Sequence, residues 1–134
     1  MAGKYRSGGL FIILIALDQV SKYWASQSLS IFRNYDFAFS TTLPEPVMYL
    51  VYGLVLGLVS WYIWTHQKKL TGVESFAWIL IVAGAVSNIG ERLLNGYVKD
   101  FIYLFSGVFN FADFYILLGI VLLFVVRGKV RPTH

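Results

Sequence analysis

Long apolar runs constrain this chain more than any other feature. They occupy residues 10–26, 47–65, 75–90 and 112–127. Each run is near the length that crosses the hydrocarbon of a bilayer at about 1.5 Å per helical residue. A soluble domain of 134 residues could not bury this much apolar surface, because 57% of the residues are hydrophobic and only 13% are charged. The sequence therefore predicts one all-α membrane domain, residues 1–134, with four transmembrane helices.

The charges beside these runs predict the orientation in the membrane. Positive charge dominates before the first run, in the linker 66–74 and after the fourth run, whereas the other two connecting segments are net negative. Cytoplasmic segments are enriched in lysine and arginine, so we expect both termini in the cytoplasm. Topology thus explains the net charge of +4 better than a nucleic-acid-binding patch does, and we expect membrane lipids, not nucleic acid, as partners.

The two segments expected on the opposite, extracytoplasmic face are longer than simple turns. Residues 27–46 and 90–110 contain many aromatic and β-branched residues, which favour strands. We expect them to form a small β-rich cradle or flap over the outer ends of the helices.

Ionisable residues in or beside the apolar runs are the candidates for function, because a charge there is destabilising unless it has a partner or a role. The acids in such positions are Asp18, Asp36, Glu91, Asp100 and Asp113. The chain has no cysteine, so any chemistry must come from oxygen and nitrogen groups.

Two pairs of these polar residues have helical spacing. Asp18 and Lys22 lie four residues apart and share a helix face, where they can form an ion pair of either structural or functional importance. Asn88 and Glu91 lie three apart and share a face if the third helix continues past the apolar run. Small residues just before Asn88 favour close helix packing.

Asp100 and Asp113 are more informative together than singly. Alone, each is typical of a solvated loop or a helix cap. On one membrane face, two aspartates can supply the general acid and the general base needed to hydrolyse an amide. Two like charges in a partly dry site tend to share one proton, and their titration then belongs to the pair.

Five motifs, in this order along the chain, resemble those of the lipoprotein signal peptidases, or signal peptidase II. They are DQVSK at 18–22, RNYDFAFS at 33–40, GAVSNIGER at 84–92, GYVKDF at 96–101 and FNFAD at 109–113. The resemblance implies an aspartyl endopeptidase of the bacterial cytoplasmic (inner) membrane, with its active site toward the extracytoplasmic face. Such an enzyme removes the signal peptide from diacylglyceryl-modified prolipoproteins by water attack at the bond preceding the lipidated cysteine. It also implies no metal and no cofactor, and we expect a monomer.

The matched motif positions imply a role for each candidate residue. The catalytic dyad positions are Asp100 and Asp113. The positions that bind substrate or orient the dyad are Asn34, Asn88, Arg92 and Asn110. The supporting positions are Asp18, Lys22 and Glu91.

Two residues depart from the motifs, and the outer segment between Asp100 and Asp113 is short. Glu91 stands where the family has aspartate, and its extra methylene can move a carboxylate by about 1 Å, so we interpret it as a supporting change outside the dyad. Asp36 replaces a glycine, and we expect the turn to survive because aspartate enters the left-handed region better than most residues.

These departures leave two alternatives to an active peptidase. One is a catalytically weakened or silent relative that binds lipidated peptides. The other is a four-span proton-coupled transporter that uses Asp18, although the strong charge bias and the position of Asp18 near a helix end favour the peptidase.

Overall fold

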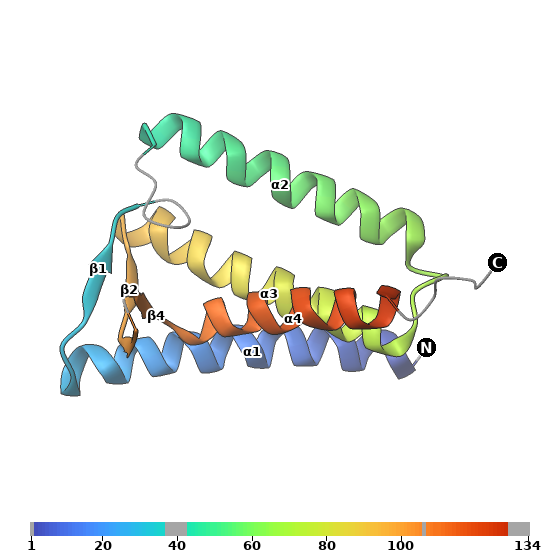
Figure 1. Cartoon of the computed structure of the whole chain (residues 1–134), viewed down its shortest axis with the longest axis horizontal. Helices are drawn as coiled ribbons and strands as arrows, with labels where there is room; N and C mark the ends of the chain where they lie inside the picture. The colour runs from blue at the N-terminus through green and yellow to red at the C-terminus, as the bar shows by residue number, and fades with distance from the viewer. Residues whose placement is uncertain (1, 37–42, 106, 129–134) are drawn as a thin grey trace.

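Helices form most of the chain, and short strands gather at one end of them (Figure 1). The computed structural model describes residues 2–36, 43–105 and 107–128. Within these residues the helices are α1 (Ala2–Ser28), α2 (Glu45–His66), α3 (Gly72–Asn95) and α4 (Phe111–Gly128). The strands are β1 (Phe32–Asn34), β2 (Val98–Asp100), β3 (Ile102–Leu104) and β4 (Gly107–Phe109).

Three helices are long and apolar enough to cross a membrane. In the described part of the chain these are α2, α3 and α4, which confirms three of the four predicted spans by length and composition. The apolar stretch of α1 is interrupted by Asp18 and Lys22. A span formed by α1 therefore stays a prediction.

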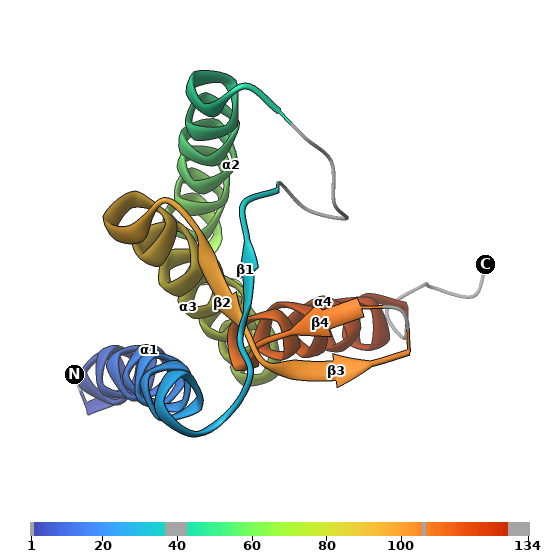
Figure 2. The same ribbon diagram turned by 90° about the vertical axis from the view of Figure 1, so that its left-hand side faces the viewer.

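The helices do not pack equally. Leu14 of α1 and Leu80 and Ala83 of α3 form a buried core, against which Tyr115 and Leu122 of α4 also pack. In the end-on view of Figure 2, α1, α3 and α4 lie together and α2 lies on the far side of α3. All of α2 is described, and Met48 is its one buried residue. The core thus belongs to α1, α3 and α4.

Close contact between α3 and α4 depends on glycine. A Cβ added at Gly84 of α3 would collide with the carbonyl oxygen of Ala112, and one added at Gly119 of α4 would lie 2.6 Å from the carbonyl oxygen of Ala77. The small residues that begin the third predicted site motif therefore permit close helix approach, as expected.

Helix α3 is capped at both ends and extends past its apolar run. Thr71 and Glu74 form a capping box at its start. Gly96, with φ of 79°, ends it in the left-handed conformation and donates its N–H to the carbonyl of Arg92. The apolar run ends at residue 90, but the helix continues to Asn95.

The strands form two small antiparallel sheets, which confirms the expected β structure in both connecting segments. In one sheet Phe32 of β1 pairs with Asp100 of β2, and in the other Ile102 of β3 pairs with Phe109 of β4. The part of the expected flap at residues 37–42 lies outside the described residues. The strands lie at one end of the helices, whereas α1 begins and α4 ends at the other (Figure 1). We refer to the first as the strand end.

Candidate active site

Asp100 lies at the strand end, on β2, with only 2% of its surface exposed. Its Oδ1 accepts a hydrogen bond from Nδ2 of Asn110 at 2.6 Å, and its Oδ2 accepts one from Nδ2 of Asn34 at 3.0 Å. Pairing of β1 with β2 brings Asn34 to this strand, and Asn110 directly precedes α4. Two predicted orienting residues therefore hold the carboxylate from opposite sides.

Asp113 lies in the first turn of α4 and is also held by Asn110. Its backbone N–H donates to Oδ1 of Asn110 at 3.1 Å, while its Oδ2 accepts from the backbone N–H of Asn110 at 2.9 Å. This is the reciprocal pattern of a capping box. The remaining Oδ1 accepts from Nδ2 of Asn88 at 2.9 Å. Asp113 is thus a helix-capping residue and also a neighbour of Asp100 across Asn110.

The surroundings of Asp100 favour its protonated form. Burial, supported by the negative charge of Asp113, raises the pKa of Asp100 from 3.8 to about 6, against the opposing effects of its two asparagine donors and of Lys22. The carboxyl group can therefore exchange a proton near neutral pH.

Lys22 lies beneath the two aspartates, completely buried. Its Nζ is 2.8 Å from Oδ2 of Asp18 and 3.0 Å from Oε2 of Glu91, and it donates to Oδ1 of Asn88 at 2.8 Å. The predicted Asp18–Lys22 pair is confirmed, as is the shared face of Asn88 and Glu91. By engaging the oxygen of the Asn88 amide, Lys22 turns the amide nitrogen toward Asp113.

Asp18 joins three helices. Beyond Lys22, its Oδ2 accepts from the Ser87 hydroxyl at 2.7 Å, and its Oδ1 accepts from the backbone N–H of Ala112 at 2.9 Å. Sequence reasoning missed Ser87 and Ala112 as partners. Ser87 lies next to Asn88 in the same motif, which was the available signal.

Glu91 contacts two lysines. Besides Lys22, its Oε1 lies 3.1 Å from Nζ of Lys99, and its Oε2 accepts a longer bond of 3.4 Å from the backbone N–H of Lys99. Lys99 was not predicted, although it adjoins Asp100 in β2. These contacts of Glu91 involve neither Asp100 nor Asp113, and its interpretation as a supporting change stays a prediction.

Arg92 holds the chain that follows β1. Its Nη2 donates to the carbonyl oxygens of Asp36 at 2.8 Å and Asn34 at 3.3 Å, and its Nη1 donates to the hydroxyl of Tyr52 on α2. Asp36 does not use the left-handed region, since among the described non-glycine residues only Phe105 has a positive φ. Instead, the N–H of Asp36 donates to Oδ1 of Asn34 at 3.1 Å, and this side-chain turn needs no left-handed residue.

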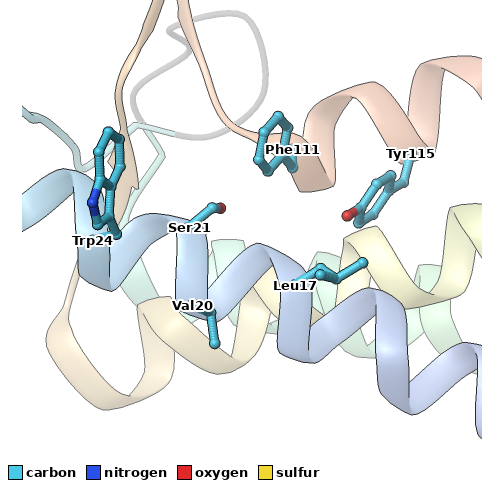
Figure 3. Close-up of a pocket in the computed structure, with 6 residues that line it drawn as sticks. All are labelled: Leu17, Val20, Ser21, Trp24, Phe111 and Tyr115. Carbon is cyan, nitrogen blue, oxygen red and sulfur yellow. The ribbon is translucent and has the colours of Figure 1, made fainter.

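An apolar groove borders the site between α1 and α4 (Figure 3). It is lined by Leu17, Val20, Ser21, Trp24, Phe111 and Tyr115. Leu17 adjoins Asp18 in sequence and Phe111 follows Asn110. The groove, which is lined mostly by apolar side chains, therefore lies next to Asp18 and Asn110.

Known proteins resemble this chain in sequence and in fold. Residues 10–127 match the family described as Signal peptidase (SPase) II. The lipoprotein signal peptidase of Hydrogenovibrio crunogenus is 33% identical, over 93% of this chain and 86% of its own length. Those of Streptococcus pyogenes serotype M1 and Fusobacterium nucleatum are 32% and 30% identical, over 88% and 87% of this chain and 90% and 82% of their own lengths.

Among solved structures, one described as a bacterial membrane enzyme has a TM-score of 0.80 at 20% identity, covering 96% of this chain and 93% of its own. At that identity the likeness concerns the fold alone. The family match spans most of the sequence and includes every candidate site residue. The chain therefore belongs to the signal peptidase II family.

Proposed function

We propose that this chain is an aspartyl endopeptidase that removes the signal peptide from diacylglyceryl-modified prolipoproteins. Membership of a signal peptidase family supports peptide cleavage. The aspartyl chemistry, the substrate and the residue roles are the proposal. Asp100 and Asp113 form the catalytic dyad, and Asn34, Asn88 and Asn110 orient it.

The observation that carries the proposal is the bridging of both carboxyl groups by Asn110. Its side-chain amide donates to Asp100, while its backbone N–H donates to Asp113. Each carboxylate oxygen has two lone pairs, so each retains capacity for a water after accepting the single donors described above. A water between the two groups would meet one proton acceptor and one proton donor.

The reaction follows from one shared proton. The ionised carboxyl group takes a proton from water, whose oxygen attacks the carbonyl carbon, while the protonated carboxyl group gives its proton to the carbonyl oxygen. On collapse, the carboxyl group that took the proton from water gives it to the amide nitrogen, the other carboxylate takes the proton of one hydroxyl group of the intermediate, and the C–N bond breaks as the carbonyl re-forms. The products are a signal peptide with a new carboxylate and a lipidated cysteine with a free amine.

Positioning must contribute beside proton transfer. General acid–base catalysis supplies roughly 10²- to 10⁴-fold, and fixing the reactants in place supplies further acceleration. The asparagine donors and the buried Lys22 cluster hold the two carboxyl groups from α1, α3, α4 and β1.

The proposed location is the extracytoplasmic face of the bacterial cytoplasmic membrane. In support, the start of α1, the α2–α3 linker and the end of α4 lie at one end of the helices, opposite the strand end (Figure 1). The start of α1 carries Lys4 and Arg6, the linker carries Lys68 and Lys69, and Arg127 lies in the last turn of α4. With α1 as a fourth span, the groove beside the dyad would face membrane lipid and the lipid chains of the substrate.

Cleavage in reconstituted membranes tests this function. The protein in lipid nanodiscs is given a precursor peptide with diacylglyceryl-modified cysteine, the same peptide without lipid as a control, and mass spectrometry identifies the cut. We expect cleavage only of the lipidated peptide, at the bond preceding the cysteine, and a loss of at least about 10²-fold in Asp100→Asn.

Two results would contradict the proposal. A wild-type protein that binds the lipidated peptide without cutting it would indicate the silent relative. Undiminished cleavage by Asp100→Asn would exclude the dyad.

A further inference from the structure

We propose that Lys99 is a positioning residue, which holds β2 and its Asp100 against α3 through Glu91. The inference rests on the proposed function, since it concerns the placement of the proposed dyad. The anchoring of β2 to α3 can be measured without any assay of catalysis.

Adjacent positions in β2 separate the two tasks. Successive side chains of a strand point to opposite faces, and the contacts follow this rule: Asp100 meets Asn34 and Asn110, whereas Lys99 meets Glu91 of α3. The strand is only three residues long, and among the described residues it pairs with β1 alone. Anchoring at Lys99 therefore limits movement of the neighbouring carboxyl group.

Lys99 is paired with a glutamate, Glu91, that is itself buried and held by a second ion pair. The side chain of Glu91 is 1% exposed and is also paired with the buried Lys22, whereas the side chain of Lys99 is 22% exposed. One carboxylate thus connects α1 to α3 through Lys22 and α3 to β2 through Lys99. An aspartate would withdraw the carboxylate by about 1 Å and could not keep both contacts at 3.0 and 3.1 Å without movement.

Charge balance gives a second signature. Asp18 and Glu91 balance Lys22 and Lys99, so the buried cluster is neutral beside Asp100. Toward the strand end, the charged groups on the elements around Asp100 are Asp18 and Lys22 of α1, Arg33 of β1, Glu91 and Arg92 of α3, Lys99 of β2, and Asp113 of α4. Removing one lysine or one glutamate changes this balance in opposite directions.

The experiment compares Lys99→Met, Glu91→Gln, Glu91→Asp and the double variant Lys99→Met/Glu91→Gln in nanodiscs. Matched controls are Lys68→Met, in the linker between α2 and α3, and Glu74→Gln, at the other end of α3. Hydrogen–deuterium exchange of peptides covering 96–101 reports on β2. Cleavage of the lipidated peptide gives kcat, KM and the pH profile.

We expect faster exchange in 96–101 for Lys99→Met, Glu91→Gln and Glu91→Asp, and no change for the controls. A displaced catalytic group lowers kcat by about 10- to 100-fold, with little change in KM. The acidic limb of the pH profile should move upward in Lys99→Met and downward in Glu91→Gln, because a lost cation favours the neutral acid and a lost anion favours the carboxylate. In the double variant the limb should return toward wild type while kcat stays low.

Wild-type exchange and wild-type kcat in Lys99→Met would overturn the inference, even if Asp100→Asn is inactive and the proposed function stands. A higher kcat in Glu91→Asp would also overturn it, since the glutamate would then be a defect. If no variant cleaves and the wild type does not either, exchange in 96–101 still decides whether Lys99 anchors β2.

Discussion

The two ends of α3 carry the same kind of ion pair in opposite surroundings. Near the strand end, Glu91 and Lys22 are each 1% exposed. Near the other end, Glu74 is 12% exposed and its partner Arg127 is 49% exposed. The exposed pair works beside a capping box, whereas the buried pair belongs to a cluster that supports two aspartates. The two pairs have similar residue types, and burial is what distinguishes the pair at the helix start from the pair beside the two aspartates.

The largest expected difference between the ends is in catalysis. Asp113→Asn should lower cleavage of the lipidated peptide by roughly 10²- to 10⁴-fold, because an amide cannot exchange the proton, while the asparagine still caps α4. Glu74→Gln should cleave like wild type. The measurement is kcat/KM in nanodiscs, with circular dichroism to verify folding; comparable losses in both variants would remove the distinction between the ends.

The second difference is in stability. Removing one partner of a buried pair costs about 3–5 kcal/mol, so we expect Lys22→Met to destabilise the protein strongly by leaving Asp18 and Glu91 less well paired. Arg127→Met, at the exposed pair, should cost less than about 1 kcal/mol. Reversible unfolding in mixed micelles measures both, and equal losses would show that burial does not set the contribution of these pairs.

Glycine contacts provide a third comparison. Gly84→Ala and Gly119→Ala each force a Cβ against backbone and should each lose about 1–3 kcal/mol. Gly84 contacts Ala112, the neighbour of Asp113, so its variant should also lose about 10-fold or more in cleavage through displacement of the dyad. Gly119→Ala should retain more activity. The control is Gly90→Ala, which adds a Cβ with nothing within 4 Å, and a larger activity loss in Gly119→Ala would contradict the assignment.

The smallest expected effect is a pH dependence at the strand end. The pKa of Asp100 is raised from 3.8 to about 6 in the folded protein. Between these two pH values the native protein therefore binds more protons than the unfolded chain. The free energy of unfolding should therefore fall as pH rises through this window. Relative to Asp100→Asn, the wild-type Tm in detergent should decrease from about pH 4 to about pH 6. Parallel Tm curves would show that Asp100 does not titrate there.

The sequence predicted the parts of this molecule that follow from regular spacing. Asp18 with Lys22 and Asn88 with Glu91 were correctly assigned to shared helix faces, because helix periodicity alone relates them. The continuation of α3 past its apolar run was left open, since an apolar run cannot reveal that Glu91 and Arg92 have buried partners. The survival of the turn at Asp36 was attributed to access to the left-handed region, whereas the turn there uses a hydrogen bond from Asp36 to Asn34.

Contacts between distant segments were the harder part. The motifs predicted which asparagines accompany the aspartates, but not that Asn110 would contact both of them. Nor could spacing show that the backbone of Ala112 would reach Asp18, or that Lys99 would reach Glu91. These pairings arise from the packing of α1, α3, α4 and β2, and no local pattern encodes them.

The pairing of Asp18 with Lys22 has a consequence for how the chain is made. Both residues belong to one helix, so the charges of Asp18 and Lys22 can neutralise each other as soon as α1 forms, before any other helix has been synthesised. Their other partners, Ser87, Glu91 and Ala112, come much later in the chain. A newly made α1 therefore carries a self-contained neutral pair, to which the last helix later adds the backbone N–H of Ala112.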